Sequence, residues 1–255
     1  MTDVIAAEFL KIRTVRSTYG LLAVIAGLMV TGVVVDFAMV ADWNGSTAAE
    51  QARFASADAR VMVIPFAQFI LGALGALAVT TEFGTGMIRP SLAAVPSRLA
   101  MVAGKTAVVG AVALVAGEVA AFGAFLLSWS VAGTYPAPLW TWSSVSDAVG
   151  PVFCSGLSVA VCGLVGLGIG LVVRSTAGAL VSLGGLLFVL PSLAFFLPEP
   201  WDTRIAAVML PNLAWQFEET SDTSVLSPGA ALLAMAAYVL VAVGAGAVAL
   251  VRRDA

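Results

Sequence analysis

The stretch EFGTGMIRPSLAAVPSRLAMVAGK, residues 82–105, decides how this sequence is organised. It lies between two long apolar runs, at residues 61–81 and 106–129. Its three basic residues are Arg89, Arg98 and Lys105. Basic residues concentrate in the cytoplasmic loops of membrane proteins. The stretch is therefore predicted to be a cytoplasmic loop between two membrane spans.

Composition indicates a membrane protein along the whole chain. Hydrophobic residues make up 60% of the 255 positions, charged residues only 11%, and the mean hydropathy is +1.03. Ordinary soluble domains carry about 25% charged residues. The net charge of −3 says little about partners, because these charges are sorted between two sides of a membrane. We expect an all-α protein with a single transmembrane domain over residues 1–255, and no nucleic-acid partner.

Six apolar runs are each close to the ~20 residues that a helix needs to cross a bilayer core of ~30 Å. They occupy residues 19–40, 61–81, 106–129, 148–173, 177–197 and 229–251. Only Arg174, Ser175 and Thr176 separate the fourth run from the fifth. The combined length of these two runs excludes one interrupted helix. We therefore expect six transmembrane helices, with a tight cytoplasmic turn between the fourth and the fifth.

Basic residues are distributed unevenly between the two sides of this layout. With both termini inside, three lie on the outer side, namely Arg53, Arg60 and Arg204. The other nine lie on the inner side: Lys11, Arg13, Arg16, Arg89, Arg98, Lys105, Arg174, Arg252 and Arg253. The six tryptophans fall on or near the outer side, as in an interfacial aromatic belt: Trp43, Trp129, Trp140, Trp142, Trp201 and Trp215. Both termini are predicted to be cytoplasmic.

The N-terminal segment is predicted to form an amphipathic helix that lies along the membrane. Ile5, Phe9 and Ile12 recur at i, i+4 and i+7, while Glu8 and Lys11 point elsewhere. Acidic residues in the segment, and the lack of a small-residue cleavage site behind it, argue against a signal peptide. The alternative interpretation is an ordinary cytoplasmic extension of the first span.

Two acidic residues lie inside predicted spans, where a charge is costly and often functional. Glu118 comes 13 residues after Lys105, which is about 20 Å deeper along a helix, and no basic residue lies at matching depth. We expect it to be protonated, hydrogen-bonded to a hydroxyl, or facing a watery pathway. Asp36 comes 17 residues after Tyr19, about 26 Å along its helix, and is also a pathway candidate. For Asp36 the simpler interpretation is exposure at the outer interface.

The sequence offers little for catalysis or metal binding. It contains no histidine, which excludes histidine-ligated zinc and Ser-His or Cys-His nucleophiles. Its two cysteines, Cys154 and Cys162, are eight positions apart, about 12 Å along a helix, and too far for a disulfide. We expect two buried free thiols, no catalytic residues and no metal site.

The triplet Gly104-Lys105-Thr106 superficially resembles the end of a phosphate-binding loop. Such a loop needs a glycine five positions before the Gly-Lys pair, and Leu99 stands there without a preceding strand. Lys105 is instead expected to extend its ammonium group to the membrane interface.

Three spans carry small residues at four-residue spacing, which lets helix backbones approach closely. They are Ala23, Gly27 and Thr31 in the first span, Ala113, Gly117 and Ala121 in the third, and Gly166 with Gly170 in the fourth. We interpret them as packing surfaces without an assigned partner.

The stretch 198–228 is predicted to be an outer polar loop. It contains Arg204 and five acidic residues: Glu199, Asp202, Glu218, Glu219 and Asp222. Residues 205–210 within it are apolar but too short to span a membrane, and Pro211 ends them. A solvated loop with a buried apolar patch is one interpretation of this stretch.

Two motifs resemble those of ABC-2 type transporter permeases. The first is the run Glu82, Phe83, Gly86, Ile88, Arg89, Ser91, Leu92, Pro96 and Arg98, which resembles the family's loop between the second and third helices. The second, residues 7–18, is similar to the family's N-terminal elbow. The resemblance implies the type V exporter-like fold, with an elbow helix over 1–18, a coupling loop over 82–105 and, as a second interpretation of 198–228, short re-entrant helices.

The resemblance also implies a function, the permease subunit of an ATP-binding cassette exporter in the plasma membrane. This chain would bind no cofactor and would not be an enzyme, because a separate ATPase subunit would hold ATP and Mg²⁺. The expected ATPase-coupling residues are Glu82, Gly86, Ile88, Arg89, Leu92, Pro96 and Arg98. A second permease subunit, identical or paralogous, and membrane lipids would be the other partners. From the residues alone, an ATP-independent channel or carrier is the alternative, and the lack of histidine disfavours a membrane-embedded enzyme.

Overall fold

The computed structural model describes residues 2–88, 90, 97–218 and 225–252, and the regular elements in this part of the chain are helices. Six helical segments are long and apolar enough to cross a membrane, in agreement with the sequence prediction. They are α2 (Arg16–Gly45), α4 (Arg60–Gly84), α6 (Arg98–Ala132), α7 (Val145–Val173), the segment Thr176–Ala194, and α11 (Pro228–Arg252). The chain is therefore an all-α, multi-pass membrane protein.

The fifth span is interrupted within its length. It consists of α8 (Thr176–Gly184), a π-helical segment η1 (Gly185–Val189) and α9 (Leu190–Ala194). Pro191 cannot donate the backbone hydrogen bond that an α-helix requires four residues back, and the π-helical turn absorbs this loss. The predicted tight turn before α8 is present, because Arg174 adopts a left-handed conformation with φ of 58°.

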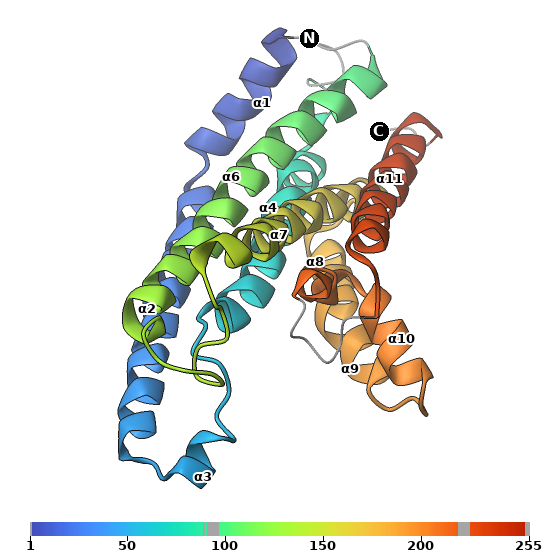
Figure 1. Ribbon diagram of the computed structural model, residues 1–255. Helices are drawn as coiled ribbons and strands as arrows, with labels where there is room; N and C mark the ends of the chain where they lie inside the picture. Colours follow the sequence, from blue (N-terminus) through green and yellow to red (C-terminus); the bar gives the residue numbers. More distant parts are fainter. Residues whose placement is uncertain (1, 89, 91–96, 219–224, 253–255) are drawn as a thin grey trace.

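Shorter helices complete the two ends of the bundle (Figure 1). They are α1 (Thr2–Thr14), α3 (Ala48–Gln51), α10 (Trp201–Val208) and the 3₁₀ turns η2 (Leu210–Asn212) and η3 (Ala214–Phe217). The start of α1 and the end of α11 lie at one end of the molecule, which we call the termini end. Helix α3 lies at the opposite end, which we call the α3 end. Six spans cross the membrane an even number of times, so the two termini must lie at the same end of the bundle.

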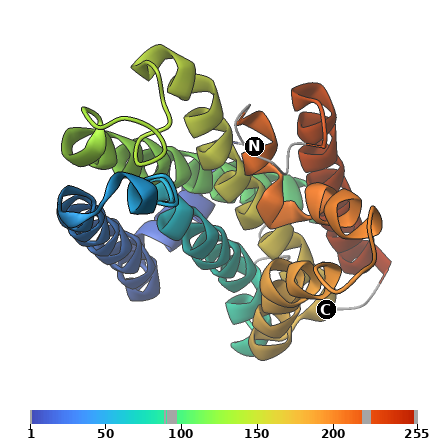
Figure 2. The same ribbon diagram turned by 60° about the horizontal axis from the view of Figure 1, so that its bottom comes forward.

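Helix α7 occupies the centre of the bundle. It lies between a group formed by α1, α2, α4 and α6 and a group formed by α8 to α11 (Figures 1 and 2). Its most apolar window is 72% buried, compared with 17% for the corresponding windows of α2 and α11. Helix α7 therefore positions the other spans.

Glycines allow the backbones of α4 and α7 to touch. A Cβ atom at Gly75 would overlap the backbone of Gly163, and a Cβ atom at Gly166 would overlap the backbone of Gly72. The predicted packing surface at Gly166 and Gly170 thus has α4 as its partner. Contact at this distance maximises dispersion attraction, which is the main force between helices in lipid.

The other two predicted packing surfaces differ from each other. Ala113 and Gly117 on α6 are buried against α7, where a Cβ atom at Gly117 would overlap the carbonyl of Gly156. On α2, by contrast, Ala23 and Thr31 are exposed and Gly27 has no neighbour within 4 Å. Small-residue spacing alone therefore does not identify a contact within this chain.

The predicted aromatic belt is wrong for two of the six tryptophans. Trp43 and Trp140 are only 7% and 5% exposed, and they belong to the apolar core. The ring of Trp43 lies edge-on to Phe54 at 5.3 Å, and the ring of Trp140 lies 5.8 Å from that of Phe125. The loops at the α3 end fold over the bundle and bury these rings, because apolar area removed from water is stabilising.

The stretch after the fifth span folds back against the bundle. Leu210 and Leu213 are completely buried, and they pack in a core cluster with residues of α7 and α11. The carbonyl of Pro211 accepts a hydrogen bond from Gln68 Nε2 at 3.4 Å. Gln68 lies eight residues after the start of α4, or about 12 Å along the helix. The stretch around Pro211 therefore reaches about 12 Å into the bundle from the α3 end. The stretch therefore contains a buried apolar patch at Leu210 and Leu213.

We predict that Gly75→Val destabilises the protein by about 3 kcal/mol, because the side chain forces α4 away from α7. In detergent the melting temperature should fall by roughly 6–12 °C. The matched control is Gly27→Val, at a helical glycine with no neighbour within 4 Å. Equal melting temperatures for the two variants would show that the α4–α7 contact is not what holds the bundle together.

Candidate functional site

Four charged side chains from three helices meet at the termini end. Lys105 Nζ, on α6, donates hydrogen bonds to Glu8 Oε2 on α1 and to Glu82 Oε1 on α4, both at 2.7 Å. Lys11 Nζ, also on α1, donates to the other oxygen of Glu8 at 2.7 Å and to Glu82 Oε1 at 2.8 Å. We call these four residues the charge cluster. Its two cations balance its two anions.

Burial makes the charge cluster a strong constraint on the fold. Lys105 is 1% exposed, Glu8 6% and Glu82 8%. Removing an ion from water costs several kcal/mol unless it is paired, and here each of the buried ions has an oppositely charged partner. The expectation that Lys105 extends to the interface is therefore wrong. Its ammonium points into the bundle because two carboxylates there replace its hydration.

Lys11 closes the charge cluster on its more exposed side. Burial lowers the pKa of Lys11, but its hydrogen bonds to Glu8 and Glu82 outweigh that effect, so the pKa is raised above its ordinary value. A raised lysine pKa means that this pairing stabilises the fold at neutral pH and is lost only in strongly alkaline solution, as the pH passes the folded-state pKa.

Helix α1 turns its charged side toward the protein. Among its residues only Glu8 is buried, whereas Ile5 and Phe9 are 39% and 51% exposed. The close approach of α1 to α6 depends on Gly104, where a Cβ atom would come within 2.7 Å of Val4 Cγ1. The predicted N-terminal helix is confirmed.

The predicted single apolar face of α1 is divided in the structure. Ile5 and Phe9 line a groove against α2 and α6, whereas Ile12 lines a separate cavity toward α4. The polar residues between them explain this division, because Glu8 must reach the ammonium of Lys105.

The predicted coupling residues fall into different surroundings. Gly86 has a φ of 73°, a conformation that favours glycine, and nothing would contact a Cβ atom there. Ile88 is only 3% exposed and packs in a core cluster with Met101 and Leu171. Ile88, one of the expected coupling residues, is therefore enclosed within this chain and not exposed for contact with a partner. Three further members, Arg89, Leu92 and Pro96, lie outside the described residues.

Two arginines bind the carboxyl end of α11. Arg98 Nη1 donates to the carbonyls of Leu250 at 2.8 Å and Val251 at 3.2 Å. Arg174 Nη2 donates to the carbonyl of Ala249 at 3.1 Å. The last carbonyls of a helix have no partners within the helix and carry partial negative charge, which cations stabilise. Arg98, which we expected to contact a partner protein, thus also anchors the final span.

A small cavity opens beside the charge cluster. It has a volume of about 260 Å³ and lies between α1, α2 and α4, with Glu8, Lys11 and Glu82 in its wall. Thr85 and Met87 also line it, and Met87 is 56% exposed. The described part of the loop after α4 therefore presents an accessible surface immediately next to the charge cluster.

The two acidic pathway candidates are both enclosed. Neither carboxylate oxygen of Glu118 has a hydrogen-bond partner among the described residues, and the carboxylate lies against Gly156 of α7. Of the three alternatives expected for Glu118, the hydrogen bond to a hydroxyl is therefore not formed with any described residue. Asp36 is only 2% exposed and accepts a hydrogen bond from Ser128 Oγ at 2.6 Å. Its expected exposure at the interface is also wrong, because α2 turns it toward α6.

Sequence reasoning missed two buried polar groups. Gln68, 1% exposed, donates from Nε2 to Ser158 Oγ on α7 at 2.9 Å. Arg60, also 1% exposed, forms ion pairs with Asp58 and with Glu218, the latter at 3.1 Å. The burial of Gln68 could have been predicted, because a glutamine within an apolar run is visible in the sequence. Arg60 was assigned to a loop by its position at the edge of a span.

Aromatic rings enclose the Arg60 guanidinium. Its Cζ lies 5.2 Å from the ring centroid of Trp142 and 6.0 Å from that of Trp215. Burial raises the pKa of Glu218, and although Arg60 lowers it, the pKa lies above its ordinary value. This group joins the start of α4 to the segments after α6 and α10, at the end opposite to the charge cluster.

Metal and thiol chemistry have little basis in the described residues. Cys154 and Cys162 are buried free thiols, as predicted. No group of three or more Cys, Asp or Glu side chains in the described ranges could hold a metal ion.

Neither a scan against protein-family models nor a search of curated proteins gave a match to this chain.

We predict that Lys105→Met lowers the stability of the protein by about 3–5 kcal/mol, because it leaves two buried carboxylates facing a single ammonium. Thermal unfolding in detergent measures the change. The matched control is Lys11→Met, whose side chain is 45% exposed in the wild type and whose loss should cost less. Adding Glu8→Gln and Glu82→Gln to Lys105→Met should restore part of the stability. No recovery would contradict the ionic origin of the effect.

Proposed function

We propose that this chain is the membrane-spanning subunit of an ATP-binding cassette exporter of the ABC-2 type, with ATP and Mg²⁺ held by a separate ATPase subunit. The observation that carries the proposal is the charge cluster. It ties α1 to the end of α4 and to the second turn of α6, which are the two flanks of the loop between those spans. A force on that loop would therefore move α1, α4 and α6 as one unit.

The helix contacts suggest how such a movement would spread. Helices α4 and α7 touch through their glycines and have little room to slide separately. Arg98 and Arg174 connect the starts of α6 and α8 to the end of α11. Closure of an ATPase dimer would press on the loop and tilt this assembly. Two such subunits, identical or paralogous, would then open a route between them toward the other side.

The proposal places the termini end in the cytoplasm and the chain in the plasma membrane. Support comes from the predominance of basic residues at that end and from the exposed Met87 next to the charge cluster, where an ATPase could dock. Glu118 and Asp36 would not line the route in this conformation, because both are enclosed within the subunit.

An ATP-independent channel or carrier is the second candidate. Buried polar groups such as Gln68, Ser158 and Glu118 favour it, because a solute path needs polar lining. However, Gln68 and Ser158 bond to each other. Two cavities of about 870 Å³ and 700 Å³ are lined by other residues than these three.

We predict that a photo-crosslinker on Met87→Cys, in a variant with Cys154 and Cys162 replaced by alanine, captures an ATPase. The captured protein should contain a phosphate-binding loop, and the yield should change when ATP is added. The matched control is a crosslinker at Ala49→Cys, an exposed position on α3 at the opposite end. Capture of such an ATPase from Ala49 alone, or from neither position, would contradict the proposed coupling surface.

Sidedness can be tested separately with single cysteines at two exposed serines. In the same cysteine-free background, Ser143→Cys should react with a membrane-impermeant thiol reagent on intact cells, and Ser97→Cys only after lysis. The reason is that the two positions lie at opposite ends of the bundle, which flank α6. Labelling of Ser97→Cys on intact cells would reverse the proposed topology.

A further inference from the structure

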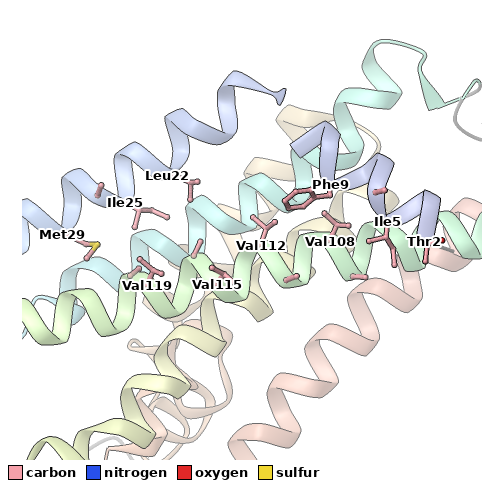
Figure 3. A pocket seen from close by; sticks show the side chains of 16 residues that line it. Thr2, Ile5, Phe9, Leu22, Ile25, Met29, Val108, Val112, Val115 and Val119 are labelled. Carbon is pink, nitrogen blue, oxygen red and sulfur yellow. The ribbon is translucent and has the colours of Figure 1, made fainter. Parts of the chain in front are cut away.

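A long groove follows one side of the bundle, between α2 and α6, with α1 along its other part (Figure 3). Figure 3 shows Ile5 and Phe9 of α1 over one half and Leu22, Ile25 and Met29 of α2 over the other half. The side chains of Val108, Val112, Val115 and Val119 of α6 form its floor. The groove has a volume of about 870 Å³.

The lining of this groove suits hydrocarbon. Of its 16 lining residues only Thr2 has a polar side chain, and the others are aliphatic, Phe or Met. Val115 and Val119 are 64% and 63% exposed, although both lie in the middle of a span. Water has no hydrogen-bond partners on such a surface, so apolar chains are its natural contents.

The dimensions favour a lipid chain over a helix. The α6 wall runs from Ala107 to Ala120, about 20 Å along the helix axis. Spread over that length, 870 Å³ corresponds to a mean cross-section of about 40 Å². An α-helix with its side chains is at least ~10 Å wide, a cross-section about twice as large. One leaflet of a bilayer provides hydrocarbon to a depth of about 15 Å, so an acyl chain of that leaflet would occupy most of this length.

A positively charged residue, Arg13, lies on the side of α1 that faces the groove. The α1 residues that face the groove are Thr2, Ile5, Ala6 and Phe9, and Arg13, four residues after Phe9, is the next position on the same side of the helix. Arg13 is exposed, as is Arg16 at the start of α2. Neither forms a hydrogen bond or ion pair with the residues that the structure describes. A guanidinium binds phosphate oxygens in a bidentate manner, which suits a lipid headgroup.

We propose that this groove is a binding site for an anionic glycerophospholipid of the leaflet at the termini end. One acyl chain lies along α6 between Ile25 and Val115, and the phosphate binds Arg13. The lipid fills the space between α1 and the two spans, so it holds α1 in the position that the charge cluster requires. This inference is independent of the proposed transport function, because it concerns a face of the bundle away from the loop after α4.

Native mass spectrometry of the detergent-solubilised protein tests the headgroup. Phosphatidylglycerol is added in one sample and phosphatidylcholine with identical chains in another. We expect the wild type to retain phosphatidylglycerol preferentially, and Arg13→Gln to reduce that retention about fivefold. The matched control is Arg53→Gln, at an exposed arginine far from the groove, near α3. Equal retention of the two lipids by the wild type would overturn the proposal.

A second pair of variants tests the groove itself. Ala26→Phe places a ring in the groove and should abolish retention of either lipid, whereas Ala23→Phe, on an exposed position of α2 outside the groove, should not. Unchanged retention in Ala26→Phe would overturn the site. A disulfide-linked dimer formed through Val115→Cys in the cysteine-free background would show that a second copy covers this face, which would also overturn it.

Discussion

The backbone contact between α4 and α7 is the constraint on which the rest of the structure depends. Gly72 and Gly75 meet Gly163 and Gly166 so closely that side chains would not fit between them. Helices in lipid gain nothing from hiding apolar surface from water, so dispersion and close approach must hold them together. Once this crossing is set, α7 offers its other glycines to α6 and α11 and becomes the buried centre of the bundle.

The charge cluster follows from this packing. The crossing brings the ends of α4 and α6 together, and Glu82 and Lys105 then lie too deep to be hydrated. Helix α1 adds a second carboxylate, Glu8, and a second ammonium, Lys11, to this pair, and it can bring them there because it approaches Gly104 closely. With an apolar N-terminal helix, buried Lys105 would keep Glu82 but lose Glu8, the second of its two carboxylate partners, and an ion in a bundle is stable only where partners replace its hydration. The polar face of α1 therefore faces inward, and its apolar face lines the groove beside α2 and α6.

At the opposite end of the bundle, Arg60 is a second buried cation that needs partners within the protein. A guanidinium within the bundle is tolerated because Asp58 and Glu218 pair with it and aromatic rings surround it. Asp58 is a neighbour in the sequence, whereas Glu218 lies far from Arg60 along the chain, so the ion pair with Glu218 also holds the segment after α10 against the start of α4. The two ends of the molecule are thus closed by buried ions, while the middle is held by contacts between small residues.

The sequence by itself determined the number and approximate bounds of the spans, the helix at the N-terminus, the tight turn at Arg174 and the state of the two cysteines. These features depend on length, local hydropathy and spacing, which neighbouring residues along the chain supply. The tertiary structure alone decided which charges are buried, as for Lys105, Asp36 and Arg60, and which apolar residues face inward, as for Ile88 and Trp43. Those outcomes depend on how each helix is rotated about its axis. That rotation is set by the glycine contacts of α7 with its neighbours. It cannot be predicted from hydropathy, because the residues of a span are similarly apolar on every side of the helix.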